Sequence, residues 1–202
     1  MYKLCKTEES ARRQREIEEG LLSAMLTVGY DELTVSGLCE RIGVPRKAFY
    51  RYFDSKDDCL AALIDHTLLE YYEFGGAHIE QDAPRSLRRE LETFFLFWLK
   101  RRDFLDALEK SKLMGKLVEV SMSIVETDMI NTKKFLPNDS EFARLQVFQF
   151  AICGLMFSML SWYRSGFAES VRNMAAASAR MLTVPLFPDL DKLGFVDETS
   201  KM

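Results

Sequence analysis

The residues best suited to chemistry in this sequence are basic and aromatic side chains gathered in one short segment. Between Arg41 and Lys56 the chain carries five basic residues and one acid, Asp54, although the whole protein has a formal net charge of −4. Guanidinium, ammonium and phenol groups interleaved in this way can donate to phosphate oxygens and to base edges in a DNA groove. This local reversal of charge favours a nucleic-acid contact over the alternative of a merely solvated basic helix.

Two short helices joined by a tight turn are predicted to position this segment. Thr34 can cap a helix that runs to about residue 42, and Gly43 makes the turn after it. Pro45 then opens a second helix over about residues 45–52, where its fixed φ and missing N–H cost nothing. A helix, a glycine turn and a basic helix are typical of a helix-turn-helix motif, whose second helix enters the major groove.

A longer helix is predicted before the motif, over residues 7–28, because its apolar residues recur at helical spacing. Arg12, Arg13 and Arg15 crowd its N-terminal half, where positive charge opposes the helix dipole. Two interpretations stay open for these arginines, which are contact with phosphate and pairing with neighbouring glutamates. Gly29 can end the helix in a left-handed conformation.

The helix after the motif is expected to connect it to the rest of the chain. Ser55 can cap this helix, and an apolar face continues to about residue 74, before Gly75 and Gly76 break it. We therefore predict a DNA-binding domain over residues 1–54 and a second domain over 55–202, with helix 55–74 as the link. Hydrophobic residues make up 48% of the 202 residues, which is enough for a sizeable core.

The run from Thr34 to Leu63 resembles the TetR/AcrR family of bacterial transcriptional regulators. The likeness rests on Thr34-Val35, Ile42-Gly43-Val44, Phe49-Tyr50-Arg51-Tyr52-Phe53 and Ser55-Lys56, and with the first helix it covers about residues 10–65. It implies an all-α protein, usually a homodimer on a near-palindromic operator, with a variable C-terminal domain for ligand binding and dimerisation. About nine helices are expected in total.

The resemblance also implies roles for individual residues. Phosphate contacts would come from Thr34, Tyr50, Tyr52 and Lys56, and base contacts from the first turn of the second motif helix. The candidate DNA-binding residues are Thr34, Arg46, Lys47, Ala48, Tyr50, Arg51, Tyr52 and Lys56. Pro45 departs from the family, which usually has a capping Ser or Thr there, and Ala48 stands where Thr is frequent. Ala48 keeps a methyl group that can touch a thymine methyl.

The C-terminal half is predicted to be a bundle of helices rich in Phe, Trp and Met. Apolar residues from Leu87 to Trp98 predict a central helix, followed by helices over about 104–114, to about 129, 140–165 and 168–183. Most of these large side chains are expected in the core, but soft apolar groups can also line a cavity for a small hydrophobic or aromatic effector. The candidate ligand-binding residues are Tyr71, Phe94, Trp98, Phe104 and Met122. Trp98 or Tyr72 could also face a cation, but the sequence locates no buried carboxylate beside them.

Residues 145–163 carry no charge over a length that could cross a bilayer. Four polar residues interrupt the segment, and a helix that is apolar all round can instead be buried between its own domain and a partner. The resemblance implies a four-helix dimer interface built from the last two helices of each chain. The candidate dimer residues are Phe148, Ile152, Leu155, Met159, Met174 and Leu182.

Other kinds of chemistry find little support. The four cysteines lack metal-binding spacing, and Cys39 and Cys59 lie on predicted apolar faces as small buried hydrophobes. His66 and Glu70 could form half of a metal site, but no second pair accompanies them. The first ten residues are polar, with no secretory signal, so a cytoplasmic location without membrane attachment is expected. We predict no metal, no cofactor and no enzymatic activity, since no nucleophile with a base and no glycine-rich phosphate loop is present.

The sequence thus predicts a ligand-responsive transcriptional regulator, in the first instance a repressor, that binds a palindromic double-stranded operator as a homodimer and is released by a small molecule. The alternative is a TetR-like coactivator or adaptor that uses the same fold for protein–protein contacts.

Overall fold

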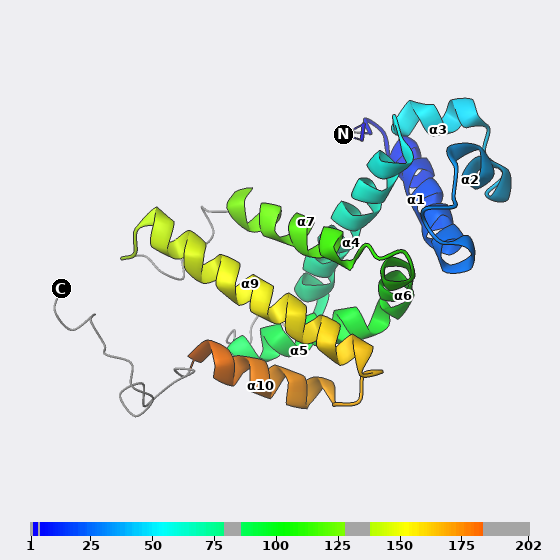
Figure 1. The fold of residues 1–202 in the computed structure, drawn as a ribbon. Coiled ribbons are helices and arrows are strands. Elements are labelled where there is room, and N and C mark those ends of the chain that lie inside the picture. The colour runs from blue at the N-terminus through cyan, green and yellow to red at the C-terminus, as the bar shows by residue number, and fades with distance from the viewer. Residues whose placement is uncertain (1, 4, 79–85, 128–137, 184–202) are drawn as a thin grey trace.

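The computed structural model describes residues 2, 3, 5–78, 86–127 and 138–183, and in this part of the chain it contains nine helices and no strand (Figure 1). The predicted all-α fold is therefore confirmed. The helices are α1 (Glu8–Val28), α2 (Val35–Arg41), α3 (Arg46–Tyr52), α4 (Lys56–His78), α5 (Leu87–Lys100), α6 (Arg102–Lys110), α7 (Met114–Thr127), α9 (Glu141–Arg164) and α10 (Val171–Thr183).

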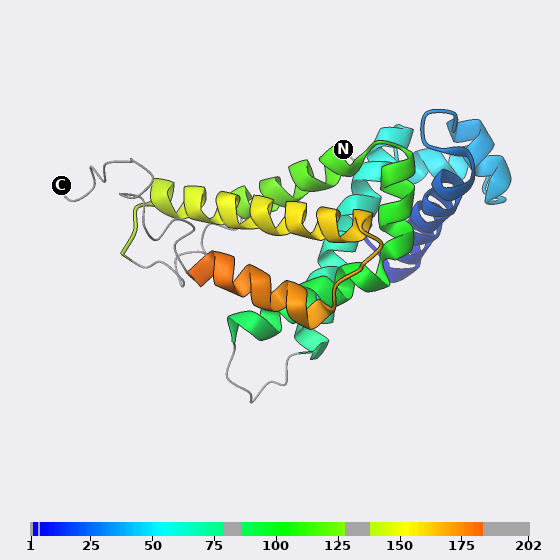
Figure 2. The same cartoon turned by 60° about the horizontal axis from the view of Figure 1, so that its bottom comes forward.

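The helices form two groups joined by α4. Figure 1 shows α1, α2 and α3 at one end of the molecule and α5, α7, α9 and α10 at the other, with α4 running between them. Helix α1 packs against both α4 and α6, so the first group is attached to the second along two lines of contact. Helices α9 and α10 lie side by side on the outside of the second group (Figure 2).

Local sequence signals explain the first group. The Thr34 hydroxyl accepts a hydrogen bond from the Gly37 N–H at 3.0 Å and so caps α2. Gly43, with φ of 66°, makes the turn into α3. Gly20 on α1 permits a close approach to the residue that ends α2, because a Cβ at position 20 would lie 2.5 Å from Cγ2 of Ile42. These features pack the three helices into one tightly fitted unit.

Three predicted helix ends differ from the structure. Helix α4 continues through Gly75 to His78, although glycine costs roughly 1 kcal/mol in a helix, and it packs against α5. Helix α6 ends at Lys110, not near Met114, because Lys112 adopts a left-handed φ of 57° and terminates it. Helix α10 begins at Val171, not at Ala168, with the hydroxyl of Ser170 accepting from the Asn173 N–H.

The second group is built around α5. Phe95 and Trp98 are buried, and the Phe95 ring meets Trp162 of α9 edge to face with 5.5 Å between ring centroids. Cys39 and Cys59 are also buried, as predicted, and burial raises the pKa of both thiols. Among the described helices α9 alone is long and apolar enough to cross a bilayer, by length and composition. Several of its large apolar side chains are exposed in the isolated chain.

Candidate DNA-binding surface and effector pocket

Helix α3 is anchored by aromatic rings and presents its charges outward. Phe49 has no exposed surface and packs against Phe53 with 5.3 Å between ring centroids. Arg46, Lys47 and Arg51 are exposed, and none of the three has an ion-pair partner among the described residues. Tyr50 is exposed by 41%, and Ala48 is half-buried on the same helix. The structure thus brings five of the predicted DNA-binding residues together on one accessible helix.

The other three predicted contacts are involved in local structure. Tyr52 is only 7% exposed, and its ring packs near Phe53. The Lys56 ammonium donates to the carbonyls of Tyr30 at 2.7 Å and Leu33 at 2.8 Å, and it lies 4.0 Å from the centroid of the Tyr30 ring. Lys56 therefore ties the start of α4 to the loop between α1 and α2. Thr34 is exposed, but its oxygen already caps α2.

The arginines of α1 form ion pairs. Arg12 and Arg13 both bind Glu16, at 2.8 and 2.7 Å, and Arg15 lies 3.6 Å from Glu18. Of the two interpretations left open by the sequence, the structure favours pairing with glutamates.

The N-terminal segment contacts α3, which the sequence did not predict. The Lys3 ammonium donates to the Tyr50 carbonyl at 3.0 Å and pairs with Asp54 at 2.7 Å, while its backbone N–H donates to the Tyr52 carbonyl at 3.0 Å. The Tyr2 ring meets His66 of α4 edge to face, and burial, followed by the nearby Asp65 carboxylate, raises the pKa of Tyr2 to about 12. An isolated lysine in a polar segment gives no periodic signal, so these contacts could be found only in three dimensions.

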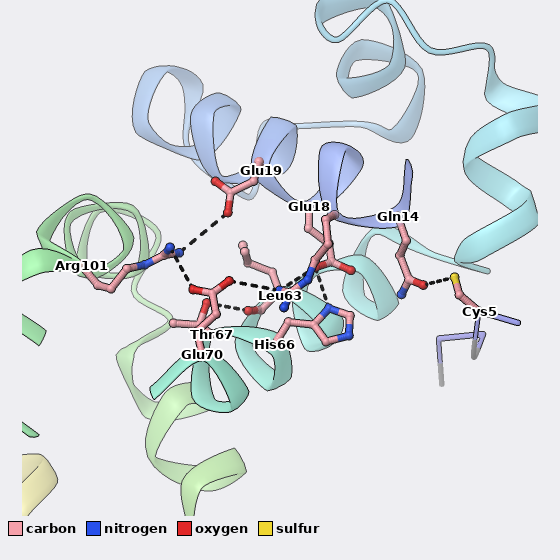
Figure 3. Close-up of polar contacts among 10 residues, drawn as sticks. Cys5, Gln14, Glu18, Glu19, Leu63, His66, Thr67, Glu70 and Arg101 are labelled. Atoms are coloured by element: carbon pink, nitrogen blue, oxygen red, sulfur yellow. Dashed lines mark hydrogen bonds and ion pairs between the residues drawn. The ribbon is translucent and has the colours of Figure 1, made fainter. Parts of the chain in front are cut away.

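A polar network joins α1 to α4 and to the start of α6 (Figure 3). Nδ1 of His66 lies 2.8 Å from the buried carboxylate of Glu18. Glu70, one turn further along α4, faces Arg15 at 3.4 Å and Arg101 at 3.2 Å. His66 and Glu70, which by spacing alone could have formed half of a metal site, instead bind different partners on other elements.

A second connection joins the two groups of helices at the other end of α1. The Lys110 ammonium, in the last turn of α6, donates to the carbonyls of Leu26 at 2.7 Å and Thr27 at 2.8 Å. These carbonyls belong to the last turn of α1, where a cation is favourable to the helix dipole. Lys110 therefore links the end of α6 to the end of α1, as His66 and Glu70 link α4 to the middle of α1.

A largely apolar pocket of about 220 Å³ lies within the second group. Its lining comes from α4, α5, α7, α9 and α10 and consists of Leu68, Tyr71, Tyr72, Leu87, Glu90, Leu91, Phe94, Trp98, Ser121, Ile152, Leu155, Met156 and Leu182. The predicted ligand-binding residues Tyr71, Phe94 and Trp98 are in this lining. Phe104 is not, since it is fully buried behind Trp98, and Met122 instead lies with its sulfur 3.4 Å from Cys153 Sγ.

The predicted dimer residues divide between the core and the surface. Met159 is fully buried within the chain, so its assignment to a subunit interface is wrong. Ile152, Leu155 and Leu182 line the pocket, and Phe148 and Met174 are half-buried. The large apolar side chains that are exposed on α9 and α10 are Phe142, Val147, Phe150, Phe157, Met181 and Leu182.

Taken together, an all-helical fold with a helix-turn-helix unit and an exposed basic second helix defines a DNA-binding transcriptional regulator. Residues 22–63 match the family profile described as "Bacterial regulatory proteins, tetR family". Residues 22–63 therefore carry the N-terminal domain typical of this family, in agreement with the resemblance of the sequence to the TetR/AcrR family.

Solved structures share the fold over most of the chain. A TetR-like transcriptional regulator from Rhodococcus sp. RHA1 is 18% identical with a TM-score of 0.59, and the match covers 91% of this chain and 100% of that one. The fatty acid degradation regulator FadR from Bacillus halodurans is 15% identical with a TM-score of 0.55, covering 89% and 96%. The dihydroxyacetone kinase operon activator DhaS is 13% identical with a TM-score of 0.54, covering 84% and 93%. No curated protein matches the chain by sequence.

Proposed function

We propose that this protein binds a two-fold symmetric DNA operator as a homodimer and represses transcription until a small molecule enters the pocket. The observation that carries the DNA contact is the set of exposed charges on α3, Arg46, Lys47 and Arg51, which have no ion-pair partner among the described residues. Positive charges left uncompensated in a chain of net charge −4 are the footprint expected of a phosphate-binding surface.

Within this proposal, residues 1–54 read DNA, residues 55–202 bind the ligand and the partner, and α4 belongs to both parts. Arg46, Lys47 and Ala48 in the first turn of α3 face base edges, while Tyr50 and Arg51 contact phosphate. Thr34 can add a phosphate contact through its hydroxyl hydrogen. Tyr52 and Lys56 act mainly by holding α3 and α4 in place.

The exposed apolar face of α9 and α10 supports a homodimer. On α9, Phe150 and Phe157 are 70% and 62% exposed. On α10, Met181 and Leu182 line a hollow of about 140 Å³ together with Phe150. A chain that leaves such a face in water gains by covering it with a second copy, at roughly 25 cal/mol per Å² of apolar area. A dimer also presents two copies of α3 to successive major grooves.

Coupling between ligand and operator is supported by the position of α4. Leu68 and Tyr71 of α4 line the pocket, and His66 and Glu70 of the same helix bind α1 and Arg101. A ligand that moves α4 thus moves the DNA-reading unit, and ligand and operator must change each other's affinity by the same factor. We propose mutual weakening, which is repression relieved by ligand, for a protein that acts in the cytoplasm.

A DNA-binding experiment tests the proposal. Fluorescence anisotropy with labelled fragments from upstream of the protein's own gene should show binding that weakens steeply as salt rises. Arg46→Ala and Lys47→Ala should each weaken binding about 5- to 150-fold, which corresponds to roughly 1–3 kcal/mol. Arg88→Ala is the control, because Arg88 is exposed on α5 and pairs with Glu92 there.

The outcome that contradicts the proposal is the absence of salt-sensitive binding to any such fragment. In that case the alternative function, a coactivator or adaptor that binds another protein, is favoured. A pull-down of the partner protein without DNA should then depend on the exposed face of α3.

A further inference from the structure

The pocket between the helices of the second group contains one carboxylate. Glu90 lies in the first turn of α5 and lines the pocket half-buried, without a hydrogen-bond or ion-pair partner for its side chain among the described residues. No basic side chain belongs to the described lining. Within those residues the negative charge of Glu90 is therefore uncompensated inside a wall that is otherwise apolar or neutral.

Aromatic rings surround the same space. The Tyr71 and Phe94 rings meet edge to face with 5.9 Å between centroids, and Phe94 meets Trp98 at 6.4 Å. Burial, and then the Glu90 carboxylate, raises the pKa of Tyr71 to about 12, so its phenol stays neutral at physiological pH. Aromatic faces and a carboxylate together form the environment in which organic cations bind best.

The lining is closed on one side and open on the other. Leu91, Trp98 and Met156 are almost fully buried and form an apolar wall. Leu87 and Tyr72 are 42% and 55% exposed, and they mark the open side of the pocket. Glu90 is half-buried. The indole N–H of Trp98 is buried and has no hydrogen-bond partner among the described residues.

We propose that the effector is a compact amphipathic organic cation, with its ammonium group against Glu90 and its apolar end among Phe94, Trp98 and Met156. This inference rests on the proposed function, in which this pocket is the effector site. A volume of about 220 Å³ favours a single ring or a short branched chain, because sites for drug-sized ligands occupy roughly 300–1,000 Å³.

A competing explanation for Glu90 is purely structural. A carboxylate in the first turn of a helix is favourable to the helix dipole, and α5 begins only three residues earlier. Under that explanation Glu90 would contribute to stability but would not distinguish a charged ligand from a neutral one. The experiment must therefore measure a preference between ligands and not stability alone.

Phenyltrimethylammonium and tert-butylbenzene provide this comparison, because they have the same shape and differ in one quaternary atom, nitrogen or carbon. Their dissociation constants are measured by ligand-observed NMR titration of the full chain, its Glu90→Gln variant and its Glu92→Gln variant. Glu92 is the matched control, since it lies on the same helix, pairs with Arg88 on the surface and is absent from the described pocket lining.

We expect the cation to bind the wild-type chain about tenfold or more tightly than its neutral isostere. Glu90→Gln should remove most of that preference by weakening the cation alone, and Glu92→Gln should leave it unchanged. Equal or tighter binding of tert-butylbenzene, or a preference that survives in Glu90→Gln, overturns the inference while the pocket remains an effector site. Binding of neither compound overturns the inference and also counts against the pocket as an effector site, while the anisotropy assay tests the DNA contact separately.

Discussion

Nδ1 of His66 on α4 lies 2.8 Å from Oε2 of Glu18 on α1, and the Glu18 side chain is only 1% exposed. The two residues are 48 positions apart in the chain and belong to different halves of the proposed regulator. A buried carboxylate requires such a partner, because removing it from water without compensation is costly. The pair therefore helps to fix the position of α1 relative to α4.

Replacing either member of this pair should destabilise the protein. Glu18→Gln and His66→Gln are each expected to lower the free energy of unfolding by about 2 kcal/mol, the scale of a hydrogen bond to a charged group. The double variant should lose at least about 0.5 kcal/mol less than the sum of the two, because the residues share one interaction. Urea unfolding measures all three. Arg12→Gln, which breaks an exposed pair with Glu16, is the control and should cost less than about 1 kcal/mol. Strict additivity would mean that the pair contributes nothing as a unit.

Lys56 should contribute to stability more than to DNA affinity. Lys56→Met keeps the apolar stem but loses the hydrogen bonds to the Tyr30 and Leu33 carbonyls, so we expect a loss of roughly 1–3 kcal/mol in urea unfolding. The dependence of DNA affinity on salt should stay as in the wild type. If the slope instead falls by about 0.9, the change expected for one lost phosphate contact, Lys56 binds phosphate as the sequence predicted.

The proposed dimer should dissociate when charge is placed on the exposed face of α9. Phe157→Glu is expected to convert the protein from two chains to one in sedimentation experiments, while the helical signal in circular dichroism is retained. DNA binding should weaken as well, since two linked reading units bind with higher effective concentration than separate ones. Leu69→Glu is the control, because Leu69 is 52% exposed on α4 and is not part of the proposed interface on α9 and α10. A wild-type chain that sediments as a monomer would contradict the dimer itself.

Tyr71 should make the protein sensitive to alkaline pH. Its pKa is raised from 10 to about 12, mainly by burial, so the folded state holds the phenol proton more tightly than the unfolded state. The resulting stabilisation is fully present below pH 10 and is lost as pH rises towards about 12, by at most about 1.4 kcal/mol per pH unit. Urea unfolding of the wild type and Tyr71→Phe should therefore differ by a constant amount from pH 7 to 9, and the wild type should lose its advantage above pH 10. A constant difference across the whole range would show that Tyr71 is not buried in this way.

The helix-turn-helix unit could be predicted because its signals are local. A threonine followed by an apolar face, a glycine at the turn and a cluster of basic residues each depend on neighbours within a few positions, and the structure contains the corresponding cap at Thr34 and positive φ at Gly43. The same local signals failed at Gly75, where a helix continues because packing against α5 outweighs intrinsic propensity.

The pairing of side chains could not be predicted, because it depends on distant parts of the chain. From the sequence, Lys56 was free to reach DNA. In the fold, the loop after α1 lies next to Lys56, and its ammonium group binds the carbonyl of Tyr30. Met159 looked suitable for an interface, since a helix that is apolar all round gives no sign of which face is covered by its own domain. The sequence located no carboxylate for the predicted pocket, but the structure places Glu90 in its lining. The position of Glu90 in the first turn of α5 gave no indication that it faces a cavity.

The close contact between Gly20 and Ile42 bears on how the proposed regulator would respond to an effector. A Cβ at position 20 would lie 2.5 Å from Cγ2 of Ile42, so α1 and the end of α2 are closely packed at this point, and close packing resists relative movement of the two helices. In the proposed dimer, the two helix-turn-helix units would then move as rigid bodies. The proposed effector would change the distance and the angle between the two α3 helices of the dimer. The internal structure of each DNA-binding unit would stay the same.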